Sequence, residues 1–414
     1  MNETSMIYQL LKDKSKKQEL RPAESIVVSP DYVVLSHRSL DKLSDSMKEG
    51  ACAIPTILIN NHLPMEGSNT PGDLALMESR GVRYYEIGRG GTPAMVAAEE
   101  GFAVPGNILL TNDRNLLELG ALGTCVLFAE PENIAALLES GKTEITVPVP
   151  FGIELLGETG KWTGGIDIAL YLLKYANLPE DHSAALEIYG EGLSALSLPE
   201  RHNLLRVLID LGYENVLCRV DDNVMAFLQD RSDAEAHFYF PAAGKKPEYG
   251  SIRVDLTNIH PMLAWKENNE VKIGSLTDKY EFPVQNVFIG GDTACRFPDI
   301  EAGLTVTGYR SLPPHVTANI LPGSQLVHND LMAMGIASIY TEIGFSLMPP
   351  AFLTLLADHP DTERTSLGTS VRILTSGGML AGALNCFAAA MTGKIIHPLE
   401  LESMLKHEAE QEDQ

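Results

Sequence analysis

One short segment restricts the fold of this 414-residue chain more than any other, the stretch GFAVPGNILLTNDRNLLELGALG at residues 101–123. A Pro-Gly turn precedes the apolar run Asn107–Leu110, which is predicted to be a short buried strand, and polar residues follow it at once. The small residues of Gly120–Gly123 are predicted to begin a helix. A strand that ends in polar residues before a Gly-rich helix start is typical of ligand sites in open α/β sheets.

The same order of strand, turn and helix recurs along the chain. Further predicted strands lie at Ser25–Val28, Ile57–Ile59, Tyr84–Ile87, Val216–Val220, Val284–Ile289 and His315–Leu321. Further predicted helices lie at residues 131–140, 166–176, 199–211 and 330–343. This repeat predicts the α/β fold class with mostly parallel sheets. We expect three α/β subdomains, at residues 1–178, 179–280 and 281–414, the last with an acidic C-terminal tail.

The composition excludes several classes of partner. The formal net charge is −24, and no cluster of Lys and Arg offers a surface for phosphates, so we expect no nucleic-acid binding. The longest apolar run, residues 377–391, is short and contains Asn385, which favours a packed helix over a membrane span. The five cysteines are scattered without a CxxC pair, as in a reducing compartment, and no secretory signal precedes them. A cytoplasmic location is therefore expected.

Several motifs occur in a fixed order and carry a resemblance. They are Glu99-Glu100-Gly101-Phe102, Pro105-Gly106, Asp113, Gly120–Gly123, and the segments at 139–142, 255–264, 286–290, 322–325 and 388–393. In this order they resemble the large subunit of the aconitase and 3-isopropylmalate dehydratase superfamily. The resemblance implies an aconitase-like three-subdomain α/β/α architecture. The family's mobile swivel domain, which is fused or forms a separate small subunit, has no counterpart here, so we expect no C-terminal swivel domain.

The resemblance also implies a cofactor, but this chain lacks the residues that bind it in the family. Members of the superfamily bind a [4Fe–4S] cluster through three cysteines, and its open iron acts as a Lewis acid. The three ligand positions correspond here to Asp292, Phe352 and Leu355. Cys295 lies three residues after the first of them, at a glycine position, and does not replace the missing ligand. We therefore expect no iron–sulfur cluster and no other metal.

The acid–base residues implied by the resemblance are also reduced in number. The family's Asp-His turn corresponds to Asn60-Asn61, with His62 one residue on, and a second family histidine corresponds to Ala94. Asn115 stands where the family has the histidine of GDSHT, whereas Asp113 is kept. The candidate catalytic residues are therefore Asp113 and Asp292. Both have a structural alternative as a helix cap, because Asp is common at that position. For Asp292 a further alternative is that it only fills the emptied cluster site.

Substrate-binding candidates are polar residues at the ends of predicted strands. They are Arg114, Asn115, Arg296, Thr293, Arg89 and His62. A guanidinium at a strand end is suited to holding a carboxylate through two hydrogen bonds. A surface position or a structural ion pair is the alternative for each arginine, and a structural role is the alternative for the histidine. Arg364 and Arg372 lie near the family's Arg-rich substrate loop but match no fixed position in it.

The remaining residues favour one reaction over others. Hydroxide is a poor leaving group without a Lewis acid, whereas moving a proton within an alkene needs only a base, positioning and positive charge. We therefore expect an iron–sulfur-independent isomerase of a small tricarboxylate, with cis- and trans-aconitate as the pair. A cluster-free dehydratase or lyase of a hydroxy-di- or tricarboxylate, and a non-catalytic carboxylate-binding protein, remain alternatives. A homo-oligomer and a small-subunit partner are both compatible with the sequence.

Overall fold

The computed structural model describes residues 5–36, 52–59, 78–85, 90–229, 231–232, 236–239, 249–308, 310–350 and 364–404. The chain forms two compact units, each made of separate segments. Unit 1 contains Met1–Gly157, Pro179–Arg201 and Gly212–Asp255, and unit 2 contains Glu158–Leu178, His202–Leu211 and Leu256–Gln414. Three sheets of four or more strands follow one another along the described chain, over residues 32–128, 150–255 and 262–381. The division into three subdomains stays a prediction.

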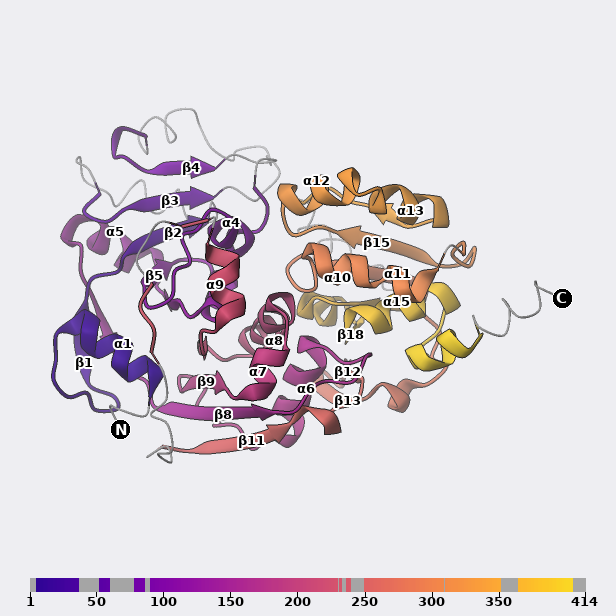
Figure 1. Ribbon diagram of the computed structural model, residues 1–414, viewed down its shortest axis with the longest axis horizontal. Helices are drawn as coiled ribbons and strands as arrows, with labels where there is room; N and C mark the ends of the chain where they lie inside the picture. The colour runs from indigo at the N-terminus through magenta and orange to yellow at the C-terminus, as the bar shows by residue number, and fades with distance from the viewer. Residues whose placement is uncertain are drawn as a thin grey trace. The chain divides into compact units, whose positions relative to one another are not determined.

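Unit 1 is built on two parallel sheets and a short antiparallel pair (Figure 1). The first sheet has the order β4-β3-β2-β5-β6, with β4 Arg83–Tyr85, β3 Thr56–Ile59, β2 Tyr32–Ser36, β5 Ile108–Thr111 and β6 Cys125–Phe128. The second has the order β10-β9-β8-β11, with β10 Asn215–Cys218, β9 Ala185–Tyr189, β8 Pro150–Leu156 and β11 Ser251–Asp255. β1 Ser25–Val28 pairs with β7 Thr143–Thr146.

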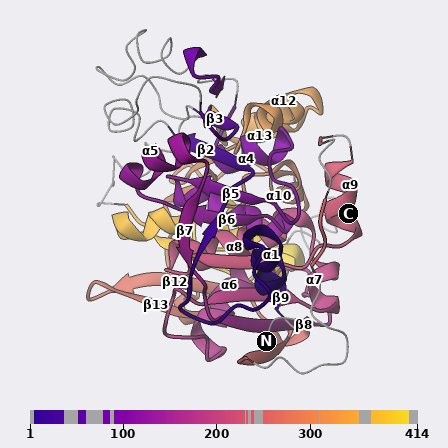
Figure 2. The same cartoon turned by 90° about the vertical axis from the view of Figure 1, so that its left-hand side faces the viewer.

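The described part of unit 1 also contains six short helices. They are α1 Met6–Ser15, α4 Pro93–Glu99, η2 Arg114–Leu122 (a 3-10 helix), α5 Pro131–Ser140, α7 Glu191–Ala195 and α9 Asp222–Leu228. α5 lies along one face of the five-stranded sheet, where its apolar residues join side chains of β2 and β3 in one core (Figure 2). Pro131 begins this helix and Gly141 ends it in the left-handed conformation, as the sequence predicts.

Unit 2 is built on a seven-stranded mixed sheet. Its order is β13-β12-β18-β17-β14-β15-β16, with β13 Glu270–Ser275, β12 Met262–Glu267, β18 Met379–Ala381, β17 Ser366–Gly368, β14 Asn286–Gly290, β15 Thr317–Leu321 and β16 Ser346–Leu347. β12 is antiparallel to both of its neighbours, and the other pairs are parallel. Helices α6 Gly165–Tyr175, α10 Phe297–Ala302, α11 Leu304–Thr307, α12 Gln325–Ala333, α13 Ile336–Ile343 and α15 Ala383–Thr392 belong to this unit, with 3-10 helices η3 Leu256–Asn258, η4 Leu276–Lys279 and η6 Val371–Ser376.

The predicted fold class is confirmed, since the protein is α/β with mostly parallel sheets. Two local predictions are wrong. Gly120–Gly123 does not begin a helix, because η2 begins at Arg114 and ends at Leu122, and Gly123 caps it with φ 75°. The helix predicted at 330–343 is two helices, α12 and α13, because Gly335 has φ 77° and interrupts the helical backbone between them.

No helix in the described part of the chain has both the length and the apolar character needed to cross a membrane.

Candidate functional site

Helix α8 (Leu198–Asp210) carries a polar stripe that is buried. Its first residues belong to unit 1, and the part from His202 onward belongs to unit 2. Asn203 and Arg206 are each 2% exposed, and Asp210 follows one turn later. Residues at positions i, i+3 and i+7 of a helix share one face, so these three side chains point the same way. Buried polar side chains require partners, and here the partners come from the other elements of unit 2.

The turn after β14 supplies the first of these partners. Gly290 and Gly291 have φ of 99° and 94°, and a Cβ atom on Gly290 would lie 2.1 Å from the carbonyl oxygen of Leu321. Only glycine fits at this position. The tight turn places Asp292 and Thr293 inside the unit, with 3% and 0% of each residue exposed. The hydroxyl of Thr369 holds the turn by accepting the Gly290 N–H at 2.9 Å and donating to the Thr293 carbonyl at 2.9 Å.

The carboxylate–guanidinium cluster, which consists of Arg206, Asp210, Asp292, Ser370 and Arg372, lies where this turn meets α8. Arg206 donates to both carboxylate oxygens of Asp210, from Nε at 3.0 Å and from Nη2 at 2.5 Å. The same Nη2 is 3.7 Å from Oδ2 of Asp292. Arg372 Nε donates to that oxygen at 2.9 Å, and the Ser370 side chain is also hydrogen-bonded to Asp292. Two carboxylates therefore share two guanidinium groups.

The two carboxylates of this cluster have opposite pKa shifts. The pKa of Asp210 is raised to about 6, mainly by burial and further by the charge of Asp292, and Arg206 and Arg372 offset only part of these effects. Burial also acts to raise the pKa of Asp292, but Arg206, Arg372 and Ser370 outweigh it, so its pKa is lowered. Asp292 is consequently ionised at neutral pH, whereas Asp210 can exchange a proton there. Environments that separate the pKa values of paired carboxylates are typical of acid–base sites.

The cluster also has side chains that solvent reaches. The side chains of Asp210 and Arg372 are 16% and 25% exposed, whereas those of Arg206 and Asp292 are 3% and 2% exposed. The terminal Nη1 and Nη2 atoms of Arg372 have no hydrogen-bond acceptor among the described residues. A carboxylate-bearing molecule could therefore bind to Arg372 with Asp210 beside it. The arrangement offers a proton carrier, an anion clamp and a low local dielectric.

Asn203 connects the start of the polar stripe to the segment that follows Thr293. Its Oδ1 accepts the N–H of Ala294 at 2.7 Å, and its Nδ2 donates to Asp299 at 2.9 Å. Ala294 has φ 52°, a conformation that costs energy for a residue other than glycine. Asp299 in turn accepts the backbone N–H of Arg296 at 3.0 Å, at the start of α10. Arg296 is 9% exposed and thus lies inside unit 2.

The other predicted site residues that the structure describes lie in unit 1. Asp113 caps η2, since its carboxylate accepts the backbone N–H of Asn115 at 3.0 Å. Arg114 forms an ion pair with Glu214, with 2.9 Å between Nη1 and Oε1, and its guanidinium lies 5.3 Å from the ring centroid of Phe128. Its side chain is 42% exposed. Asp113 therefore caps a helix and Arg114 forms a surface ion pair, as the structural alternatives predict. A role in catalysis or substrate binding stays a prediction for both residues.

Two predicted substrate-binding residues, Arg89 and His62, lie outside the described residues. The same holds for Asn60, Asn61, Phe352 and Leu355, which the sequence analysis matched to family positions.

The structure brings Asp292 and Thr293 together with three residues that the sequence prediction did not assign to the site, Arg206, Asp210 and Arg372. Arg206 and Asp210 are four residues apart in a helical segment, and such pairs are ordinarily solvated surface ion pairs. One signal was available, because Asn203, Arg206 and Asp210 are the polar residues of the segment 203–211, which is otherwise apolar. The burial of that stripe depends on β14 and η6, which are distant in the sequence.

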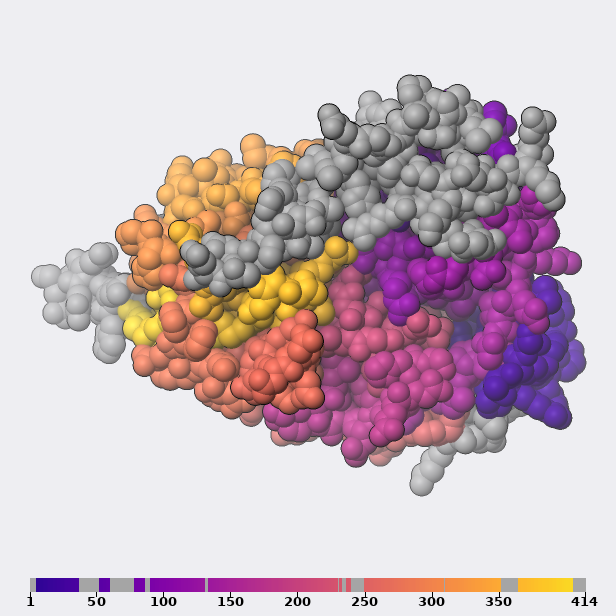
Figure 3. All heavy atoms as spheres, turned by 180° about the vertical axis from the view of Figure 1, so that it is seen from behind, coloured from indigo at the N-terminus to yellow at the C-terminus, as the bar shows by residue number. Residues whose placement is uncertain are grey.

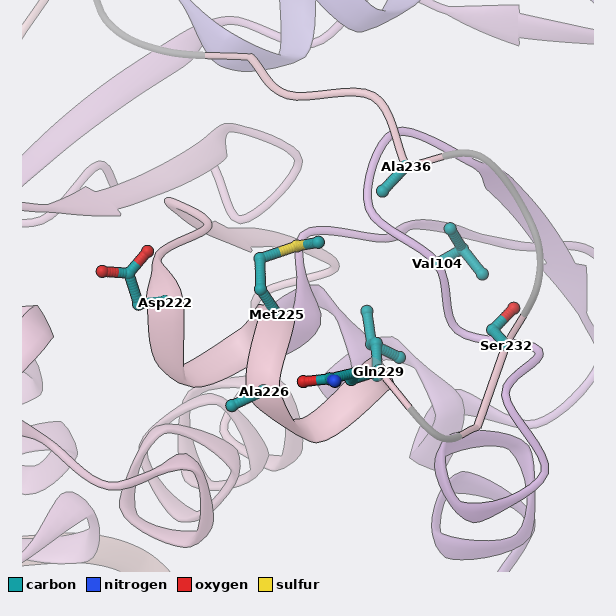
Figure 4. A pocket seen from close by; sticks show the side chains of 8 residues that line it. Val104, Asp222, Met225, Ala226, Gln229, Ser232 and Ala236 are labelled. Atoms are coloured by element: carbon teal, nitrogen blue, oxygen red, sulfur yellow. The ribbon is translucent and has the colours of Figure 1, made fainter.

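A separate pocket of about 400 Å³ lies in unit 1 beside α9 (Figure 4). Its lining is mostly apolar and consists of Val104, Asp222, Met225, Ala226, Leu228, Gln229, Ser232 and Ala236. None of the predicted site residues is among them. We therefore place the candidate site at the carboxylate–guanidinium cluster.

The donor set of the cluster does not fit an iron–sulfur centre. Such a centre is bound by thiolates, whereas position 292 presents a carboxylate held by two positive guanidinium groups. Positive groups beside the ligand position repel a cation. Within the described ranges, no group of three or more His, Cys, Asp and Glu side chains could hold a metal ion.

Comparison with known proteins gives the following similarities. The family model described as the aconitase family (aconitate hydratase) matches residues 74–376. A 3-isopropylmalate dehydratase large subunit 2 of Rubrobacter xylanophilus is 26% identical over 335 residues, which cover 78% of each chain. A 3-isopropylmalate dehydratase large subunit of Syntrophus aciditrophicus is 24% identical over 363 residues, covering 84% of this chain and 86% of that one. The crystal structure of Thermococcus kodakaraensis aconitase X (holo-form) aligns with a TM-score of 0.49 and 10% identity, over 95% of this chain and 92% of that chain.

Proposed function

Because this chain belongs to the aconitase family, we propose that it is an enzyme that acts on a small tricarboxylate, and that it isomerises cis- and trans-aconitate by an allylic proton shift without an iron–sulfur cluster. The observation that carries this proposal is the pair Asp210 and Asp292, whose pKa values are shifted in opposite directions. Aconitate is named from the family and from the chemistry that the remaining residues can perform.

Asp210 is the proton carrier in this proposal. Its carboxylate removes a proton from the CH2 group of aconitate, and the electron pair delocalises over the three-carbon unit and its carboxylates. Protonated Asp210 then returns the proton to the carbon at the other end of that unit, which moves the double bond and regenerates the carboxylate. No atom is gained or lost, and no group has to leave. A general base with a pKa close to the working pH is the most effective one.

Arg372 holds the substrate in this proposal. Its Nε remains bonded to Asp292, which fixes the guanidinium plane, and its terminal nitrogens receive a substrate carboxylate. Arg206 lies against Asp210 and adds the positive charge that stabilises the delocalised anion. Asp292 stays ionised and positions Arg372, so it acts through that arginine. Thr293 and Arg296 adjoin this site in sequence and keep their proposed roles as substrate contacts.

Iron is not needed for this reaction. An aconitase-type dehydration needs a Lewis acid because hydroxide has to leave. An allylic proton shift needs a base and charge stabilisation, and the carboxylate–guanidinium cluster supplies both. The loss of all three thiolate positions of the family is consistent with such a change of chemistry.

Two alternatives have support of their own. The names of the similar proteins, 3-isopropylmalate dehydratase large subunits, favour a dehydratase or lyase of a hydroxy-di- or tricarboxylate. The absence of the family's histidines from their positions favours a protein that binds carboxylates without turnover. Asp113 as the proton carrier stays a competing assignment within the isomerase proposal.

One experiment separates these possibilities. Chelator-treated protein is incubated with cis-aconitate in D2O, and the products are followed by proton NMR. Formation of trans-aconitate supports the isomerase, whether or not deuterium is incorporated. Appearance of citrate or isocitrate would identify a dehydratase, and perturbed substrate signals without any product would identify a binding protein.

A further inference from the structure

We propose a second anion site in unit 2, the basic pocket, which takes a compact oxyanion of two or more negative charges, of the phosphate or polycarboxylate kind. The basic pocket has a volume of about 260 Å³ and is formed by Trp265, Lys266, Lys279, Phe282, Arg364 and the backbone around Thr365. Three of these side chains are cationic, and none of the described residues that line the pocket is acidic. The proposal does not depend on the reaction at the carboxylate–guanidinium cluster.

The pocket is lined by cationic residues, whereas the protein as a whole is acidic. The chain has a formal net charge of −24, so a pocket with three cationic residues and no acidic one among its described lining residues is unusual for it. Lys266 and Lys279 form no ion pair with a carboxylate among the described residues. The acidic neighbour of Lys279 in sequence, Asp278, is engaged elsewhere, because its carboxylate accepts the Ser275 backbone N–H at 3.0 Å. A bound anion would supply the negative charge that Lys266 and Lys279 lack among the described residues.

Two aromatic rings fix one of the cations. The Lys279 ammonium lies 5.0 Å from the ring centroid of Trp265 and 5.5 Å from that of Phe282. Cation–π contacts of this kind hold an ammonium group in place without neutralising it. Lys279 therefore keeps its full charge for a ligand, and the flexible stem of a lysine is already ordered. Lys266 and Arg364 are exposed at the sides of the pocket. The β12–β13 hairpin that carries Trp265 and Lys266 lies on the face that Figure 3 shows, in coral.

The basic pocket is distinct from the candidate active site. Thr365 immediately precedes β17, and Gly377 lies just before β18, so the pocket is at the amino ends of these parallel strands. Thr369 and Ser370 follow the carboxyl end of β17 and belong to the opposite edge. The volume of the basic pocket is smaller than the 300–1,000 Å³ that is usual for sites of drug-sized ligands. This small volume favours a small oxyanion.

Trp265 lines this pocket and can report binding through its fluorescence. The chain has two tryptophans, so the buried Trp162 is changed to Phe and Trp265 becomes the only source of tryptophan fluorescence. The Trp162→Phe protein is titrated with inorganic phosphate, pyrophosphate and citrate, with sodium chloride of equal ionic strength as the reference. We expect a saturable change in Trp265 emission with a dissociation constant in the millimolar range or below. Saturation by phosphates alone identifies a phosphoryl ligand, and saturation by citrate alone identifies a polycarboxylate.

Matched variants test the assignment. Lys266→Ala leaves the Trp265–Lys279 contact in place, and we expect it to weaken binding at least about threefold, with Lys266→Ala and Lys279→Ala together weakening it tenfold or more. Because Lys279→Ala alters the fluorescence itself, the double variant is measured by calorimetry. Lys272→Ala is the control, since Lys272 lies on the adjacent strand and pairs with Glu270. The proposal is overturned if no anion gives saturation, if the double variant binds as well as the parent, or if Lys272→Ala weakens binding equally.

Discussion

Asp210 and Asp292 differ in how strongly the two guanidinium groups stabilise each carboxylate. At Asp292, Arg372 at 2.9 Å, Arg206 at 3.7 Å and the Ser370 side chain outweigh burial. At Asp210, burial and the charge of Asp292 outweigh Arg206 and Arg372. Two carboxylates that share cations in a dry site cannot both be stabilised equally as anions. The less stabilised one, Asp210, is also the more exposed of the two, so it is the group that a substrate can reach.

Asp210→Asn tests the proton carrier. We expect turnover of cis-aconitate to fall about 10²–10⁴-fold, the range that a general acid–base contributes. The amide retains one acceptor for Arg206, and Asp292 still faces that arginine, so the fold should persist, as judged by circular dichroism. Asp113→Asn is the matched control, because Asn caps a helix as well as Asp does. Full activity of Asp210→Asn, or an equal loss in Asp113→Asn, would remove Asp210 from this role.

The raised pKa of Asp210 also predicts a pH profile. A base acts in its ionised form, so kcat/KM should rise with pH until the pKa of Asp210, about 6, is passed, and then level off. The measurement is the initial rate of isomerisation at subsaturating substrate between pH 4.5 and 8. The pKa values of aconitate itself are determined separately and their contribution is removed. A rate that falls as the pH rises through this window would contradict the assignment.

At the scale of elements, the turn after β14 determines where Asp292 lies. Gly290→Ala would place a Cβ atom 2.1 Å from the Leu321 carbonyl oxygen at φ 99°. We expect a loss of at least about 2 kcal/mol in the free energy of unfolding, together with lost turnover. Gly335→Ala is the control, since Gly335 also has a positive φ of 77° but no atom within 4 Å of the added Cβ. Its cost should be about 1 kcal/mol. If both variants lost the same free energy of unfolding, measured with urea, crowding of the Cβ atom at position 290 would be unimportant.

Asp167 joins two other elements of unit 2 and makes their association depend on pH. Its carboxylate is 1% exposed and accepts the backbone N–H groups of Met262 in β12, at 2.7 Å, and of Gly164 before α6, at 2.9 Å. Burial raises the pKa of Asp167 to about 7, against the opposing effect of these hydrogen bonds. A raised pKa means that the contribution to stability is fully present below the pKa of the unfolded chain, about 4, and is lost as the pH rises to about 7.

Asp167→Asn removes this titration. We expect the variant to be less stable than the parent at pH 5 by about 1–3 kcal/mol, because one backbone N–H loses its acceptor. Between pH 5 and pH 7.5 the parent should lose about 2 kcal/mol that the variant does not lose, so the two free energies of unfolding converge. Urea unfolding at both pH values provides the comparison. If the free energies of unfolding of the parent and the variant changed equally between the two pH values, Asp167 would not titrate in this range.

At the scale of the whole molecule, the sequence predicts the fold class and most element positions. Strands such as β14 and β15 are apolar runs that end in Gly-rich turns, and these local patterns are sufficient to find them. The residues of the candidate site are harder to predict from local sequence patterns. Asp292 was found because it replaces a family ligand, whereas Asp210 and Arg372 enter the site only when α8, β14 and η6 come together. The pairing of residues 80 or more positions apart has no local pattern in a single sequence.

In the proposed reaction, the carboxylate–guanidinium cluster moves a proton on a tricarboxylate without an iron–sulfur centre. The most direct test is the turnover of cis-aconitate by protein that is purified without oxygen and assayed before and after chelation, with its iron and sulfide content measured in the same samples. We expect substoichiometric iron and a rate of trans-aconitate formation that chelation leaves unchanged. Brown, iron-loaded protein whose turnover disappears on chelation would contradict it.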